Sequence, residues 1–452
     1  MKKISQLIMG LILCGVLTAS APAQSIYSTP YTFTTIAGTA GNNGAIDGTN
    51  GAAQLYWPEG VAVDTNGNLY VADNYENTIR KVAPVGTNWV VTTIAGTAGS
   101  SGGTDGTNGA ARFNEPVGIT IDGTGNLYVA DYGNNTIREI TPSGTNWVVS
   151  TIAGSDGTGG FADGTNGGAQ FNQPSGIAMD TNGILYVADA YNCTIREVAP
   201  SGTNWVVTTI AGTATNIDGI VPNYGSTDGT NGAAQFFGPS SIAIGRSGNL
   251  FVADTYNYTI RKVAPSGTNW VVSTIAGQVG NSGFTDGTNL AAQFYYSYGI
   301  TSDRSGNLYV ADTYNYTIRK IAPSGTTNWV VSTLAGVAGT TGGADGTGTN
   351  ALFSYPYAVA TDGAGHLFVG DTVNGTIRMG WIAAIPNLKV VLTATNSVVV
   401  SWPSLGGYTL QSNPDLTTTN WSGYGGAVTT INGTNSVTIS PPSGKLFFRL
   451  KN

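Results

Sequence analysis

The stretch Gly306–Lys320, which reads GNLYVADTYNYTIRK, decides the fold because it recurs six times along the chain with small changes. Each copy holds an aspartate that is followed seven residues later by an arginine. Successive aspartates lie 58, 58, 65, 58 and 59 residues apart, and a fixed period of this length predicts a repeat architecture. The pairs are Asp73 and Arg80, Asp131 and Arg138, Asp189 and Arg196, Asp254 and Arg261, Asp312 and Arg319, and Asp371 and Arg378.

One repeat contains four short segments with the composition of β-strands. The segments 118–122 (GITID), 127–131 (LYVAD), 136–140 (TIREI) and 146–154 (NWVVSTIAG) are separated by Gly-, Asn- and Pro-containing turns. Four strands per unit is typical of a β-propeller blade. A glycine-rich loop, 155–174, then leads to the next unit and contains a DGTNG turn and a candidate one-turn helix at 169–171.

The number of blades follows from the number of strands. The GNLYVAD-type strand occurs six times, whereas the fourth strand with its tryptophan occurs five times after a GNLYVAD strand. The segment Tyr31–Gly38, YTFTTIAG, matches the end of the missing fourth strand but precedes the first repeat. We therefore expect an all-β, six-bladed propeller that the N-terminal segment closes, so that no strand edge is left unpaired.

The pattern P-x-G-[IV]-A-[VM]-D…G-N-L-Y-V-A-D-x-x-N-x-T-I-R…T-I-A-G resembles the NHL repeat over residues 31–381. Copies with a D-G-x-x-x-A-A-Q-F segment are similar to the secreted bacterial branch of that family. The pattern differs from the family in the Thr after N-x and in Gly245, which replaces a first-strand aspartate.

Composition and the chain ends suggest the compartment and the domains. Residues 1–23 resemble a secretory signal peptide, with Lys2 and Lys3, a short apolar run and Ala21-Pro22-Ala23. We expect the propeller over 24–384, a small antiparallel β module, sandwich-like, over 385–452 with Trp402 and Trp421 in its core, and no transmembrane span. A net charge of −7 and 10% charged residues argue against nucleic-acid binding.

The repeated polar residues are interpreted as scaffold. A site that is used once does not need six copies, so each Asp/Arg pair is expected to anchor the loop that follows the Asp and to tie neighbouring strands. The DGTNG-type aspartates are expected to stabilise turns, because a calcium ion needs six to eight oxygen ligands. The single histidine, His366, falls in a turn on the opposite face from the loops between blades, so we predict no metal, no cofactor and no catalytic residue.

Positions that differ between repeats are the candidates for recognition. We call the face that carries the loops leading into each blade the loop face. Tyrosine and tryptophan there predict an aromatic, uncharged binding surface around the channel mouth, and inter-blade packing is the alternative role for these side chains. The seven-residue insertion within Asn216–Tyr224 lies on the same face. The candidates are Tyr56, Trp57, Glu59, Tyr75, Glu115, Tyr191, Tyr256, Tyr295, Tyr296, Tyr298, Tyr314, Tyr355 and Tyr357.

The sequence thus predicts a secreted or cell-surface NHL-type propeller that acts as a non-catalytic binding module. Its partner would be an extracellular protein or polysaccharide, and the C-terminal module would serve attachment. Two alternatives remain: a propeller-type lyase or hydrolase with a site in the central channel, and an architectural surface protein.

Overall fold

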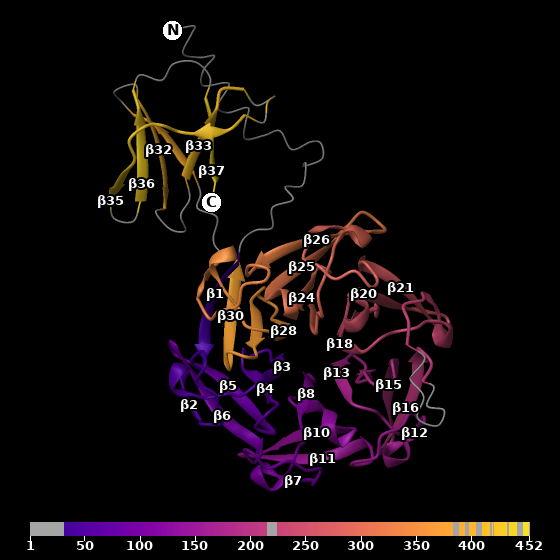
Figure 1. Ribbon diagram of the computed structural model, residues 1–452. Coiled ribbons are helices and arrows are strands. Elements are labelled where there is room, and N and C mark those ends of the chain that lie inside the picture. The colour runs from indigo at the N-terminus through magenta and orange to yellow at the C-terminus, as the bar shows by residue number, and fades with distance from the viewer. Residues whose placement is uncertain are drawn as a thin grey trace.

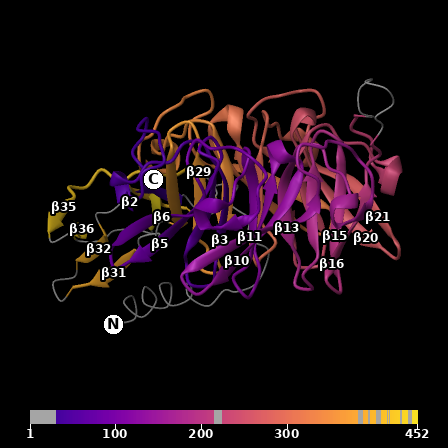
Figure 2. The ribbon, with the colours of Figure 1, turned by 90° about the horizontal axis from the view of Figure 1, so that it is seen from below.

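Six antiparallel sheets radiate from a common axis and form a closed ring (Figure 1). The computed structural model describes residues 31–214, 224–382, 388–393, 397–403, 409–415, 418, 420–431, 434–440 and 446–451. The predicted signal peptide and all but Tyr224 of the insertion lie outside these residues. Figure 2 shows the ring edge-on, with strands running between its two faces.

Each sheet is one repeat, and its strands follow the order expected from the sequence. The innermost strands are β3 (Pro58–Val63), β8 (Pro116–Ile121), β13 (Pro174–Met179), β18 (Pro239–Ile244), β23 (Gly299–Ser302) and β28 (Pro356–Thr361). The second strands are β4 (Leu69–Asp73), β9 (Leu127–Asp131), β14 (Leu185–Asp189), β19 (Leu250–Asp254), β24 (Leu308–Asp312) and β29 (Leu367–Asp371). The third strands are β5 (Thr78–Val85), β10 (Thr136–Ser143), β15 (Thr194–Ser201), β20 (Thr259–Ser266), β25 (Thr317–Ser324) and β30 (Thr376–Ile382).

The outer strands complete the blades and close the ring. The fourth strands are β6 (Asn88–Gly96), β11 (Asn146–Gly154), β16 (Asn204–Ala211), β21 (Asn269–Gly277), β26 (Asn328–Ala335) and β1 (Tyr31–Ala37). The first strand of the chain, β1, pairs antiparallel with β30, from Tyr31 opposite Ile382 to Ala37 opposite Ile377. The predicted six blades and their closure by the N-terminal segment are therefore confirmed.

Each blade has a fifth strand at a position where the sequence predicts only a turn. The Gly-Thr of every DGT turn pairs with the fourth strand, as Gly48 does with Val91. These strands are β2 (Gly48–Thr49), β7 (Gly106–Thr107), β12 (Gly164–Thr165), β17 (Gly229–Thr230), β22 (Gly287–Thr288) and β27 (Gly346–Thr347). A 3₁₀ turn follows each: η2 (Asn50–Ala52), η3 (Asn108–Ala110), η5 (Asn166–Gly168), η6 (Asn231–Ala233), η8 (Asn289–Ala291) and η10 (Gly348–Asn350).

The helical turn expected at 169–171 was placed three residues too late. The turn is η5, Ala169 is its C-cap, and Phe171 is fully buried between blades. Three further 3₁₀ turns follow second strands: η4 (Tyr132–Asn134), η7 (Thr255–Asn257) and η9 (Thr313–Asn315).

The core of the ring lies between neighbouring blades. Every second strand is buried along its whole length, because both of its faces are covered by adjacent sheets. A buried aromatic ring from the loop before each inner strand fills the gap in five blades: Phe113, Phe171, Phe236, Phe294 and Phe353.

The Asp/Arg pairs are fully buried and clamp the loops of the loop face. In blade one Arg80 donates to Asp73 at 2.7 Å, to Asp47 of the DGT turn at 2.9 Å and to the Gln54 carbonyl at 3.0 Å. Asp73 accepts from the backbone N–H of Tyr56 at 2.7 Å. The expected anchoring role is thus present: the backbone N–H that the aspartate holds lies in the loop before the inner strand. In five blades the aspartate also holds the loop that follows it, through a side chain, as Asn134 Nδ2 donates to Asp131 Oδ2 at 2.8 Å.

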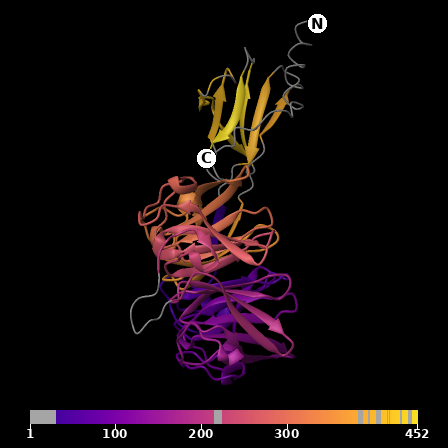
Figure 3. The same cartoon turned by 90° about the vertical axis from the view of Figure 1, so that its right-hand side faces the viewer.

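The C-terminal strands form two small sheets, which Figure 3 shows gathered into one module. Among the described residues, Trp402 is buried with Val400, Leu410 and Val437, which come from both sheets. Trp421 was expected in this core but is half-buried beneath the guanidinium of Arg449, 4.6 Å from its ring centre. The strands are β31 (Lys389–Leu392), β32 (Val398–Pro403), β33 (Thr409–Asn413), β34 (Ser422–Gly423), β35 (Thr429–Ile431), β36 (Thr434–Ile439) and β37 (Phe447–Lys451).

Candidate functional site at the mouth of the channel

The start of each inner strand places one side chain around the opening of the central channel on the loop face. In five blades this is the second residue of the strand, and in blade five it is the residue just before β23. We call this set the mouth ring. It consists of Glu59, Val117, Ser175, Ser240, Tyr298 and Tyr357.

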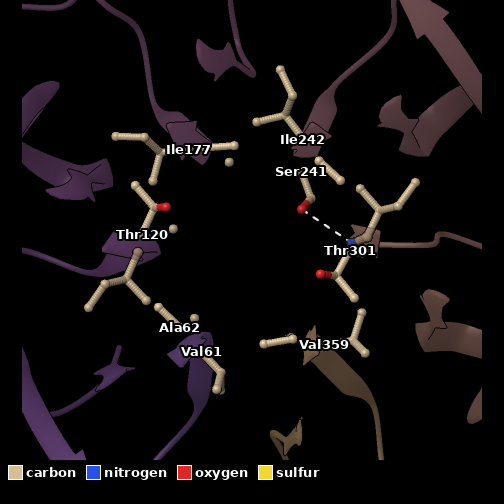
Figure 4. A pocket seen from close by; sticks show the side chains of 18 of the residues that line it. Val61, Ala62, Thr120, Ile177, Ser241, Ile242, Thr301 and Val359 are labelled. Carbon is tan, nitrogen blue, oxygen red and sulfur yellow. Dashed lines mark hydrogen bonds between the residues drawn. The ribbon is translucent and has the colours of Figure 1, made fainter. Parts of the chain in front are cut away.

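A cavity of about 320 Å³ runs from the mouth ring along the inner strands. Figure 4 shows aliphatic side chains around it, among them Val61, Ile177, Ile242 and Val359. Glycines such as Gly60 keep the bore narrow, because a Cβ there would collide with the backbone of the next inner strand. Hydroxyl groups of Thr120, Ser241 and Thr301 alternate with these aliphatic side chains, and the mouth ring is where the side chains of the six blades differ most in chemistry.

Glu59 is the single carboxylate among the residues that line this cavity. Burial, with a smaller contribution from the negative charge of Glu115, raises its pKa to about 8. Among the described residues, no hydrogen bond or ion pair to the Glu59 carboxyl is formed. The group is therefore mostly protonated at neutral pH and has unused hydrogen-bonding capacity.

Tyr298 and Tyr357 lie side by side in the mouth ring. Their rings stack with centres 4.1 Å apart and planes at 19°. Burial raises the pKa of both phenols well above the usual value, and the Glu59 charge adds to both shifts. The two tyrosines thus stay neutral at every physiological pH and share an electrostatic environment with Glu59.

The residue two positions before each mouth-ring residue has left-handed backbone. Its φ is 60° at Trp57, 52° at Glu115, 53° at Gln173, 45° at Tyr296 and 51° at Tyr355, and Gly238 has 58° in blade four. A non-glycine residue in this conformation costs about 1–2 kcal/mol. The scaffold imposes this geometry in all six blades, yet only one blade uses the glycine that would fit without strain.

A patch of seven tyrosines covers the loop face over blades four to six. Tyr296 is at its centre and contacts four other rings at centre distances of 4.9–5.5 Å. Tyr256 and Tyr314 are the most exposed members, at 43% and 37%. This tyrosine patch consists of Tyr256, Tyr258, Tyr295, Tyr296, Tyr314, Tyr316 and Tyr355.

The remaining sequence candidates lie outside this patch. Tyr56, Trp57 and Tyr75 form a separate aromatic group on blade one, with Tyr56 and Tyr75 centres 4.1 Å apart. Tyr191 is 60% exposed and, within the described residues, has no aromatic neighbour. Glu115 is exposed and donates its backbone N–H to Asn77 at 2.8 Å.

Sequence reasoning missed three tyrosines of the loop face. Tyr132 occupies the position that is Asn74, Ala190, Thr255, Thr313 or Thr372 in other blades, and its hydroxyl lies 2.9 Å from Gln173 Oε1. Tyr258 and Tyr316 replace the Asn77-type residue at the end of the same loop, where φ is 60° in both. The variation between repeats that identified the other candidates is present at these positions too and would have found them.

The described residues contain no group of three or more His, Cys, Asp or Glu side chains placed to hold a metal ion. His366 lies in the turn between β28 and β29, where its Nδ1 is 2.7 Å from Asp362 Oδ2. Asn68 forms the matching bond to Asp64 at 2.7 Å in blade one, so His366 acts as an ordinary turn residue. The helices of the described part include none that is both long and apolar enough to cross a membrane.

Comparison with known proteins agrees with this architecture. The NHL repeat family matches residues 55–82, 113–140 and 171–197, and the teneurin NHL domain family matches residues 204–385. The Arabidopsis thaliana protein SUPPRESSOR OF QUENCHING 1, chloroplastic, is 31% identical over 295 residues, covering 63% of this chain and 26% of that protein. Human NHL repeat-containing protein 2 is 28% identical over 293 residues, covering 59% of this chain and 39% of that protein. This chain therefore matches well under half the length of either relative.

Solved structures share the fold at low sequence identity. A structural genomics protein from Bacteroides thetaiotaomicron aligns with a TM-score of 0.57 and 21% identity, over 77% of this chain and 75% of that one. An auxiliary nutrient binding protein from the same organism aligns with a TM-score of 0.58 and 16% identity, over 78% and 77%. The repeat matches and the sheet order agree: the chain carries NHL repeats and folds as a β-propeller, a fold that it shares with these solved structures.

Proposed function

We propose that this propeller is a non-catalytic binding module for an extracellular glycan or protein, which it contacts through its loop face. The observation that carries the proposal is the array of exposed tyrosines in the loops after the second strands. Tyr75, Tyr191, Tyr256 and Tyr314 occupy one loop position in four blades and are 37–60% exposed. Exposed aromatic side chains offer large contact area with little loss of rotamer entropy.

The strain in the loops supports the same proposal. Five bulky or polar residues keep left-handed backbone at positions where glycine would suffice, and the buried Asp/Arg clamps hold these loops in place. Backbone strain that rigid surroundings maintain is common at ligand sites. The loop face is thus prearranged, which lowers the entropy lost on binding.

An extracytoplasmic location fits residues 1–23 and the proposed ligand. The structurally similar auxiliary nutrient binding protein of Bacteroides thetaiotaomicron has the same fold, and a nutrient-derived glycan is a ligand class consistent with stacked tyrosines. Tyrosine rings pack on sugar faces, while their hydroxyls bond to sugar hydroxyls.

Retention on immobilised polysaccharides and on extracellular protein extracts tests the proposal. The double variant Tyr256→Ala with Tyr314→Ala should lose retention, because it removes the two most exposed rings of the tyrosine patch. Val85→Ala is the matched control, since Val85 is 57% exposed and lies at the end of β5, in the turn on the opposite face. Retention that is equal in the double variant and the wild type would refute binding by this surface.

An enzymatic role in the channel is a second candidate, and Glu59 is the observation that favours it. A carboxyl that is protonated at neutral pH is suited to general acid catalysis. A hydrolase or lyase of this kind would lose turnover in Glu59→Gln, whereas the binding module would show no turnover of the retained polymer in either protein. Product release from a retained polymer therefore separates the two candidates.

A further inference from the structure

We propose that the mouth ring binds an organic ammonium ion between the carboxyl group of Glu59 and the stacked rings of Tyr298 and Tyr357. This proposal rests on the proposed function, because it names a ligand group for the same face. It adds a charge requirement at the channel opening that the outer tyrosine patch does not have.

The arrangement of the mouth ring places the carboxyl next to the aromatic pair. Blades five, six and one are consecutive, so Tyr298, Tyr357 and Glu59 form one arc of the ring. All three side chains line the same cavity, and the Glu59 charge acts on both phenols. A cation at this arc would meet a carboxylate on one side and aromatic rings on the other, which is the arrangement that recognises ammonium groups.

Within the part of the chain that the structure describes, no cationic side chain forms an ion pair with Glu59. The strands packed against β3 are β4, β8, β28 and β29, and β8 carries no titratable side chain. Asp73 of β4 and Asp371 of β29 are already paired with Arg80 and Arg378. The other titratable groups facing this region are Tyr70, which lies beside Asp64, and Glu115, Tyr132, Tyr256, Tyr298 and Tyr357.

These neighbours are all neutral or acidic, so the potential at the mouth is negative once Glu59 ionises. The wall below the ring combines aliphatic side chains with the hydroxyl groups of Thr120, Ser241 and Thr301, and the cavity has room for the alkyl groups of a small ammonium ligand. A neutral sugar can contact the rings and hydrogen-bond to the carboxyl, but it forms no ion pair with the ionised carboxylate, whereas a cation does. The site therefore selects a cation.

Binding is coupled to the ionisation of Glu59. The free protein holds a proton on this group at neutral pH, because burial and Glu115 raise its pKa to about 8. A bound cation favours the carboxylate, so the proton is released when the ligand binds. The association constant should rise with pH, by about tenfold between pH 7 and 9, as the ionised fraction of Glu59 increases.

Calorimetric titration of the full chain with tetramethylammonium tests the proposal, because the charge of this probe does not depend on pH. Wild type should bind more tightly at pH 9 than at pH 7 by about tenfold. It should release protons at pH 7, measured as a dependence of the heat on the ionisation enthalpy of the buffer. Glu59→Gln, which keeps the side-chain size, should lose this pH dependence and the proton release. tert-Butanol, a neutral probe of similar size, should bind both proteins weakly and equally at both pH values.

A second variant separates the ring contacts from the charge. Tyr357→Leu with Tyr298→Leu should weaken tetramethylammonium binding at pH 9 while the proton release per bound ion remains. Absence of binding by wild type, or equal binding by wild type and Glu59→Gln at pH 9, would overturn the ammonium site. If the ammonium site fails in this way but wild type is still retained on polysaccharide, the proposed function stands. Loss of retention in the Tyr256/Tyr314 double variant tests the tyrosine patch alone and says nothing about the ammonium site.

Discussion

Thr35 donates from both its backbone N–H and its hydroxyl to Oδ1 of Asp345, at 2.9 Å in each case, across 310 residues of sequence. Thr151 likewise donates twice to Asp105 in blade two, from its hydroxyl to Oδ1 at 2.9 Å and from its backbone N–H to Oδ2 at 3.1 Å, and there both residues belong to one continuous stretch of chain. The N-terminal strand therefore reproduces the bonds of an ordinary fourth strand. The ring is closed by the same chemistry that builds each blade.

Removal of the buried ring of β1 should destabilise this closure. Phe33 is fully buried and meets Phe353 edge-on at 5.2 Å, so Phe33→Ala should lower the free energy of unfolding by about 3–5 kcal/mol. Thr34→Ala, a half-buried neighbour on the same strand, is the control and should cost under about 1 kcal/mol. Urea denaturation measures both, and equal losses in the two variants would contradict the closure role.

The two aspartates that share one arginine should differ sharply in how much each contributes to the free energy of unfolding. In blade two Asp131 and Arg138 are both fully buried, whereas the side chain of Asp105 is 50% exposed. Asp131→Asn should cost about 3–5 kcal/mol because it removes the buried counter-charge of the guanidinium and leaves only the half-exposed Asp105 paired with it. Asp105→Asn should cost about 0–1 kcal/mol, since solvent screens an exposed partner. Thermal and chemical unfolding of the two variants provide the comparison, which fails if their stabilities match.

The raised pKa of Glu59 should make stability fall with pH. The folded protein holds its proton up to a pKa of about 8, whereas the unfolded chain releases it near the ordinary value of 4.5. Folding is therefore most favourable below pH 4.5 with respect to this group, and the benefit is lost as pH rises toward 8, by up to about 1.4 kcal/mol per pH unit. Glu59→Gln removes this slope, so its stability relative to wild type should increase from pH 5 to pH 8. A constant difference between the two proteins would show that Glu59 titrates normally.

The left-handed loop position should prefer glycine for stability. Glu115 is exposed with φ at 52°, so its side chain adds little packing and its backbone is strained. Glu115→Gly should be more stable than Glu115→Ala by about 1 kcal/mol, because alanine keeps the strain. Melting temperatures of the two variants measure this difference, and a less stable glycine variant would show that the loop is not strained.

The sequence was sufficient to predict the blades because each blade consists of consecutive antiparallel strands joined by short turns. The LYVAD strands and the turns between them are encoded within a few tens of residues, and the fixed period gives their number. The closure by β1 was predictable because the last repeat lacks a fourth strand and the segment Tyr31–Gly38 matches the end of that strand. The fifth strand was missed because Gly-Thr has no strand signal of its own, and its pairing depends on the DGT aspartate that Arg80-type residues hold in place.

The candidate site was predictable in composition but not in arrangement. Variation between repeats pointed to Tyr296 and Glu59, yet it gave no indication that one belongs to an outer patch and the other to a buried mouth. The strain at Trp57 and Tyr355 is a property of backbone angles that neighbouring clamps impose. Trp421 was assigned to a core because large aromatic residues are usually buried, whereas Arg449 shields it from outside.

The pairing of Tyr31 with Ile382 brings the two ends of the propeller together at one blade. The first residue of β1 and the last residue of β30 are thus neighbours in one sheet. Because its two ends are adjacent, the propeller can be inserted as a domain into a loop of another protein. The loop face would keep its shape in any such fusion, because neither junction passes through it.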